Sequence, residues 1–89
     1  MGEVADRMRA KLERAFSPTR LEIVDDSERH QGHAGHNGAG ESHFNLLIEA
    51  PAFAGVTRVE RQRMINRTLA MEIGGPVHAL AIKALAPGE

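Results

Sequence analysis

The chain has 89 residues, a formal net charge of −1 and no cysteine. This length predicts a single domain with a small core, and the near-zero charge excludes a basic field for nucleic acid over the whole surface. The missing cysteine excludes disulfides, a thiol nucleophile and a metal site made only of thiolates. No apolar run approaches the roughly 18 residues of a membrane span, so we expect no membrane contact and a cytoplasmic location.

The first half of the chain predicts one helix and two strands. Residues 2–16 carry apolar side chains at helical spacing and stop before Pro18, which predicts an amphipathic helix. Residues 20–25 and 42–50 alternate apolar and polar side chains, which predicts two strands of a hairpin. Residues 26–41 between them are rich in glycine and histidine and have no core-like residue, so we expect a long functional loop.

The second half predicts a helix and a third strand. A short helical turn is expected near Phe53, and Thr57 is a suitable N-cap for a helix over 58–73. Residues 77–83 predict the third strand. A tail over 84–89 follows, and we expect Ala86 to Glu89 to be unordered. The expected fold class over residues 1–89 is therefore α+β, in the order α-β-β-α-β, with three strands in one sheet and helices on one face.

Histidine is the unusual residue type, because four of the five lie between positions 30 and 43. The five are His30, His33, His36, His43 and His78. Imidazole is the commonest metal ligand, so the loop could hold a metal, or its histidines could simply be solvated. His43 opens a strand, where a hydrogen bond to a strand or helix end explains it better than a metal does. His78 lies one residue into the third predicted strand, where a side chain can reach solvent, and it is the stronger site candidate.

Four arginines lie within ten residues of the second predicted helix: Arg58, Arg61, Arg63 and Arg67. Such a group can contact phosphates, but Glu60 and Glu72 dilute its field, and a solvated helix face explains it better. The sequence shows no paired catalytic carboxylates, no phosphate-binding loop and no nucleophile signature, so we predict that the chain is not an enzyme.

Taken together, several motifs resemble the BolA family. In chain order they are Ser17 to Glu22, Leu21 to Ser27 followed by His30, Glu41-Ser42-His43-Phe44, Pro51 to Gly55, Arg61-x-Arg63-Met64-Ile65, and Val77 to Ile82. The resemblance runs from Met8 to Pro87 with order and spacing kept. Gln62 departs from the pattern, because many relatives carry histidine there.

This resemblance implies a class II KH-like fold, α-β-β-α-α-β, with a three-stranded mixed sheet. It also implies a monothiol glutaredoxin as partner and a bridging [2Fe-2S] cluster with glutathione as co-ligand, and no cofactor in the isolated protein. The implied ligands are His78 and His30, with His33, His36 and His43 as alternatives. A chain without cysteine can supply nitrogen ligands while a partner supplies thiolates.

Two other functions remain open from the sequence. The family includes regulators of stress and cell-envelope genes, so a DNA-binding transcriptional regulator is the alternative, with the four arginines as contacts. A third hypothesis is a metal carrier that uses the histidines of positions 30 to 43 without a partner. The sequence also leaves a homodimer open.

Overall fold

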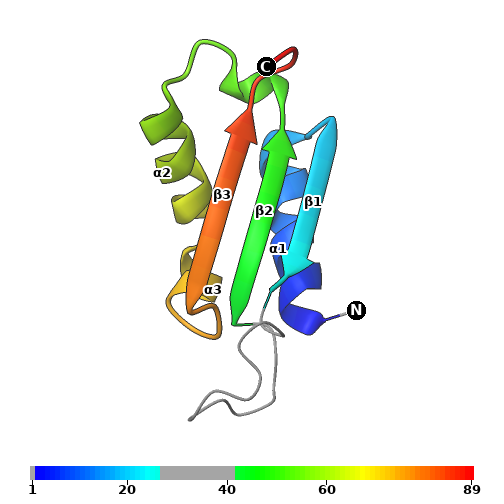
Figure 1. Ribbon diagram of the computed structural model, residues 1–89, viewed down its shortest axis with the longest axis vertical. Coiled ribbons are helices and arrows are strands. Elements are labelled where there is room, and N and C mark those ends of the chain that lie inside the picture. The colour runs from blue at the N-terminus through cyan, green and yellow to red at the C-terminus, as the bar shows by residue number, and fades with distance from the viewer. Residues whose placement is uncertain (1, 27–41) are drawn as a thin grey trace.

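A computed structural model describes residues 2–26 and 42–89 of the chain (Figure 1). Its elements are α1 (Glu3–Phe16), β1 (Arg20–Asp25), β2 (His43–Glu49), the 3-10 turn η2 (Pro51–Phe53), α2 (Arg58–Thr68), α3 (Ala70–Ile73) and β3 (Ala79–Leu85). This order confirms the predicted α+β class and the α-β-β-α-α-β sequence of elements that the resemblance implies. Among the described residues, no helix has both the length and the apolarity to cross a membrane.

The three strands form one mixed sheet in the order β1-β2-β3. The central strand β2 pairs antiparallel with β1 and parallel with β3, with Phe44 opposite Asp25 on one side and Leu80 on the other. The end of β1 and the starts of β2 and β3 therefore lie at the same edge of the sheet. One face of the sheet packs on the helices, and in Figure 1 the other face is toward the viewer, with α1 behind β1 and β2.

The core lies between the helices and the inner face of the sheet. Its buried apolar residues are Val4, Met8, Leu12, Phe16, Phe44, Leu46, Ile48, Ala50, Phe53, Ile65, Leu69, Val77 and Ala86. The alternating side chains of β2 supply the sheet side of this core, and the helical stripes of α1 and α2 supply the other side. The ring of Phe53 packs on that of Phe16 at a centroid distance of 5.1 Å, so the expected turn at Phe53 closes the core.

The helix predicted over 58–73 is interrupted, which corrects that prediction. Thr57 caps it as expected, because its hydroxyl accepts the backbone N–H of Glu60 at 3.1 Å. The Thr68 hydroxyl donates back to the carbonyl of Met64 at 2.9 Å, and Leu69 leaves helical geometry with φ −103° and ψ 20°. Hydroxyl bonds of this kind compete with the helix ladder and bend helices. The chain resumes as the short helix α3.

The third strand begins two residues later than the predicted 77 and ends two residues beyond the predicted 83. The backbone N–H of Val77 donates to Glu72 in the preceding turn at 2.9 Å, which holds Val77 out of the ladder. At the far end, the N–H of Ala50 donates to the carbonyl of Leu85 at 3.0 Å and extends the pairing. His78 therefore lies just before the strand and not inside it.

The predicted tail 84–89 and the expected disorder of its residues 86–89 are also wrong. The first two residues of the tail belong to β3, and the side chain of Ala86 is buried. Ala86 to Glu89 form a turn closed by a 3.1 Å bond from the N–H of Glu89 to the carbonyl of Ala86, with Gly88 at φ +89°. Proline followed by glycine is the usual central pair of a type II turn, so the Pro-Gly dipeptide was the available signal.

Candidate functional site

The structure brings two of the predicted site histidines together. The rings of His43, the first residue of β2, and His78, which precedes β3, have a centroid distance of 5.6 Å and an interplanar angle of 57°. His30, His33 and His36 lie outside the described residues. Their roles as ligands, and the metal-carrier hypothesis that uses them, therefore stay predictions.

Parallel pairing of β2 and β3 explains why the two histidines meet. His43 stands opposite Ala79 in the register, so the residue before Ala79 reaches the same edge. The carbonyl of Ser42 accepts the backbone N–H of His78 at 2.7 Å and that of Ala79 at 3.0 Å. The N–H of Asp26 donates to the carbonyl of His43 at 2.7 Å, so the residues flanking 27–41 both lie here. We call this the histidine edge, defined by Asp26, Ser42, His43, His78 and Ala79.

The side chains of the histidine edge differ in exposure. His78 is exposed, and His43 is half-buried with its Nδ1 at 3.0 Å from the Ser42 hydroxyl, which orients the ring. A shallow pocket of about 260 Å³ adjoins the edge on the open face of the sheet. Its lining is Asp26, His43, Phe44, Asn45, Ala79, Leu80 and Ala81. The edge thus presents imidazole nitrogen next to a small, accessible hollow.

The histidine edge can supply part of a metal site. Two imidazoles that share one ion each place a nitrogen about 2.0–2.1 Å from it, which leaves their centroids roughly 5–6 Å apart, and the rings of His43 and His78 meet that condition. Within residues 2–26 and 42–89, however, no three histidine, cysteine or carboxylate side chains are grouped so as to hold a metal. The described edge therefore fits a group whose remaining ligands come from elsewhere.

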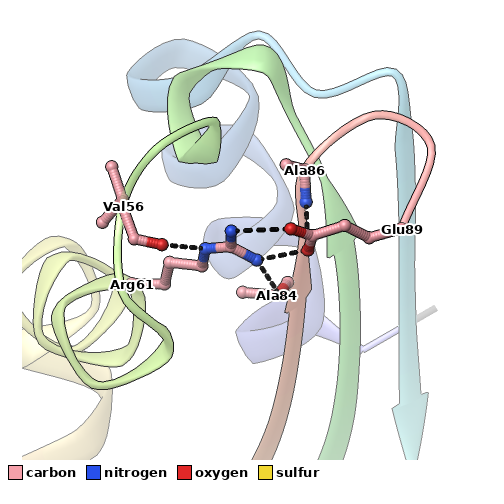
Figure 2. A network of polar contacts seen from close by, with 5 residues as sticks. All are labelled: Val56, Arg61, Ala84, Ala86 and Glu89. Carbon is pink, nitrogen blue, oxygen red and sulfur yellow. Dashed lines mark hydrogen bonds and ion pairs between the residues drawn. The ribbon is translucent and has the colours of Figure 1, made fainter.

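The four arginines predicted as nucleic-acid contacts in the alternative function differ in their exposure to solvent. Arg61 is only 4% exposed, and its guanidinium donates to the carbonyls of Val56 at 2.8 Å and Ala84 at 3.0 Å (Figure 2). It also pairs with both carboxylate oxygens of Glu89, at 2.6 and 3.0 Å. All these partners lie inside the chain, so the prediction of Arg61 as a nucleic-acid contact, or as part of a solvated face, is wrong.

The pair formed by Arg61 and Glu89 has clear electrostatic consequences. The hydrogen bond from Arg61, helped by the backbone N–H of Ala86 at 3.0 Å, lowers the pKa of Glu89 to about 2. The hydrogen bond to Glu89 raises the pKa of Arg61 above its ordinary value, against the effect of burial. This contact is a structural clamp on the end of β3.

The other three arginines are exposed. Arg63 and Arg67 lie at 3.6 and 3.4 Å from the carboxylate of Glu60, which offsets part of their charge, and Arg58 lies on the same helix. These three remain available for phosphate, but the helix presents a weaker basic surface than its sequence suggests.

Sequence reasoning missed the buried carboxylate of Glu72, which is 2% exposed. It lies seven residues after Ile65 and three after Leu69, and this helical spacing places it on the core side. The helix predicted over 58–73 ended instead with the apolar Ile73, which is exposed in the structure. A charged residue in phase with a buried stripe was the signal that a partner had to exist.

Comparison with known proteins gives one family. Residues 12–89 match the family described as BolA-like protein. The chain is 45% identical over 87 residues to the "Uncharacterized protein in cobS 5'region" of Sinorhizobium sp, covering 97% of this chain and 94% of that one. It is 43% identical over 79 residues to the "DNA-binding transcriptional regulator BolA" of Escherichia coli (strain K12), covering 89% of this chain and 71% of that one.

Relatives from Arabidopsis thaliana extend the comparison. The solved structure of the BolA domain of SufE1 has a TM-score of 0.86 and 41% identity, and the match covers 98% of this chain and 95% of that one. The chain is 42% identical over 93 residues to "SufE-like protein 1, chloroplastic/mitochondrial", a match that covers all of this chain but 25% of that protein. Because relatives carry such names, the expected cytoplasmic location stays a prediction.

Proposed function

The chain belongs to the BolA-like protein family, and from that premise we propose that it is a partner of monothiol glutaredoxins. In this proposal the two proteins and glutathione ligate a bridging [2Fe-2S] cluster for iron–sulfur trafficking or iron sensing. The observation that carries the proposal is the pair of imidazoles, His43 and His78, with ring centroids 5.6 Å apart at one edge of the sheet.

The donor chemistry of the chain supports a shared cluster over a resident one. A [2Fe-2S] cluster takes four ligands, usually cysteine thiolates, and in Rieske centres two histidines replace two of the cysteines on one iron. This chain has no cysteine, so its contribution is nitrogen and the thiolates must come from the partner and glutathione. Bound in this way, the cluster would supply iron and electrons, and its histidine ligands would raise its reduction potential.

The chain's own task is to hold neutral imidazoles in place. His78 is the first ligand in this proposal, because its ring is exposed while its backbone is bonded to Ser42. His30 is the second ligand that the resemblance implies, with His33, His36 and His43 as alternatives, and His43 is the one described near His78. Histidine ligands must lose a proton to bind metal, so we expect the complex to weaken as the pH falls from about 8 to 5.

The test is visible absorption and circular dichroism of the chain mixed with a cluster-loaded monothiol glutaredoxin and glutathione. The spectrum of the wild type should change on mixing, and that of His78→Ala should not. Asn45→Ala is the matched control, because Asn45 is an exposed polar residue of β2 beside the same pocket and is not a proposed ligand. His30→Ala, His33→Ala, His36→Ala and His43→Ala then identify the second ligand. An unchanged wild-type spectrum, or full retention of the change in His78→Ala, would contradict the proposal.

A second candidate function is DNA binding, favoured by the name of the E. coli relative. On this chain the contacts would be the exposed Arg58, Arg63 and Arg67, without Arg61. Three phosphate contacts predict that log K falls with log salt at a slope of about −3. Fluorescence anisotropy with duplex DNA between about 50 and 200 mM salt measures this slope. A flat salt dependence, or an unchanged affinity in Arg63→Ala, would count against DNA binding through α2.

A further inference from the structure

Glu72 is a buried carboxylate that joins α3 to α1. The ammonium of Lys11 donates to its two oxygens at 2.9 and 2.8 Å, and Nε of Arg7 lies 3.5 Å from the second oxygen. Burial raises the pKa of the Glu72 carboxyl, but the hydrogen bond from Lys11, the residue's own backbone N–H and the two cations lower it, to a net value below the ordinary one. Glu72 is therefore charged at neutral pH and tied to α1.

The same residue organises the turn that leads to β3. Its backbone carbonyl accepts the N–H of Gly75 at 3.2 Å and that of Val77 at 2.9 Å. The turn is tight, since a Cβ on Gly75 would lie 3.1 Å from the carbonyl oxygen of Met71. A helix of four residues such as α3 has little stability of its own, so its place depends on side-chain anchors of this kind.

His78 follows this turn directly. On one side, the N–H of Val77 donates a hydrogen bond to the carbonyl of Glu72, and the side chain of Val77 is buried in the core. On the other side, the N–H of His78 is bonded to the carbonyl of Ser42 at 2.7 Å. The position of the exposed imidazole is thus set by two anchors, one on β2 and one on α3, and α3 is in turn held by Lys11.

We propose that Glu72, held by Lys11, is a positioning residue that fixes the turn before β3 and so sets the ring of His78 beside that of His43. This inference rests on the proposed function, because it concerns the delivery of the proposed ligand. It assigns a reason to the burial of a charge at this point of the fold. A partly buried ion pair is weak support for stability by itself, and the role that we assign to this one is to specify one arrangement of the turn.

The experiment compares Lys11→Met, which keeps the aliphatic stem but removes the cation, with the conservative Lys11→Arg. The matched control is Glu22→Gln, which breaks an exposed ion pair with Arg20 on β1, 2.8 Å long, far from the turn in the register. Amide hydrogen exchange and histidine side-chain resonances of the complete labelled chain are recorded by NMR. The spectroscopic titration with cluster-loaded glutaredoxin and glutathione follows for each variant.

We expect Lys11→Met to speed amide exchange at Val77 and His78 by about ten-fold more than at Ile48 in the middle of β2. The resonances of the His78 ring should shift. The spectral change with cluster-loaded glutaredoxin should require a higher concentration of this variant than of the wild type. Lys11→Arg should restore wild-type behaviour, and Glu22→Gln should match the wild type throughout.

Equal acceleration at all three amides, or unshifted His78 resonances, would overturn the inference and leave Glu72 with a purely stabilising role. The two proposals fail separately. If the wild type gives no spectral change with glutaredoxin, the proposed function fails, while the exchange and ring resonances of the free chain still decide whether Glu72 positions His78.

Discussion

Among the described residues, one buried charged side chain lies near each end of β3, and the two have different roles. Arg61 lies where β3 finishes and meets two backbone carbonyls and the carboxylate of Glu89. Glu72 lies in α3, just before the turn that leads to the histidine edge, and its carboxylate pairs with Lys11. The first end is closed, because the polar groups drawn together there pair with one another (Figure 2). The second end leaves the ring of His78 exposed.

This difference shows how a small domain separates stability from function. The buried guanidinium of Arg61 makes four hydrogen bonds inside the chain and therefore has little left to offer a ligand. At the histidine edge, backbone bonds and an ion pair hold the chain while the imidazole remains accessible. A functional group needs rigid support and accessible donor atoms, and within residues 2–26 and 42–89 the histidine edge provides that combination.

The largest loss of stability is expected for Arg61→Met, which removes the buried charge at the closed end. This change leaves the carbonyls of Val56 and Ala84 without their donor and Glu89 without its counter-ion. We expect the melting temperature to fall by roughly 10 °C, since losing a buried polar network is among the few changes with large effects. Thermal denaturation followed by far-UV circular dichroism measures it. A fall smaller than about 2 °C would show that this end is not a clamp.

Lys11→Met should have an intermediate effect at the other end, about 1–3 kcal/mol in the free energy of unfolding. The wild-type pKa of Glu72 is below its ordinary value, so its contribution to stability is present at neutral pH and lost as the pH falls through the acid range. Without Lys11, the side-chain hydrogen bond that lowers the pKa of Glu72 most is lost, so this pKa rises. The difference in stability between wild type and variant should therefore grow from pH 3 to pH 7, measured by urea denaturation, and a difference independent of pH would contradict this account.

Glu89→Gln should destabilise the closed end less than Arg61→Met does. The pKa of Glu89 is about 2 in the folded chain against an ordinary 4.5, so its pair with Arg61 stabilises the fold above about pH 5 and is lost as the pH falls toward 2. The variant should melt a few degrees lower at pH 7 and should meet the wild type near pH 2. Parallel melting curves of the two proteins across this range would argue against the pairing.

The sequence predicted the parts of the fold that depend on local patterns. Helical spacing located α1, alternation located β1 and β2, and the cap at Thr57 marked the start of α2. The mixed character of the sheet came from the resemblance, because alternation alone does not reveal strand direction. That β2 and β3 are the parallel pair is a finding of the structure. The interruption at Leu69 depends on one hydroxyl, that of Thr68, which a sum of helix propensities does not see.

The contacts that the sequence could not predict are long-range. Lys11 and Glu72 are 61 residues apart, and Arg61 and Glu89 are 28 apart, so no local pattern links either pair. Arg61 was grouped with the three exposed arginines because all four lie within ten residues of the sequence. The structure shows that Arg61 is the one that points inward. Among the candidate site residues, His43 and His78 were each identified separately, but their proximity follows from strand register.

The smallest expected change in stability belongs to the residue with the largest expected change in function. His78 is exposed, and its backbone N–H, which bonds to Ser42, is kept in any substitution except proline. His78→Ala should therefore alter the free energy of unfolding by no more than about 0.5 kcal/mol, as for other exposed positions. The same variant should lose the spectral change with cluster-loaded glutaredoxin. Urea denaturation and the spectroscopic titration, run on one preparation, measure both quantities. A large loss of stability would mean that the His78 ring is a structural partner of His43, and that the open end of the sheet is held together by side chains as the closed end is.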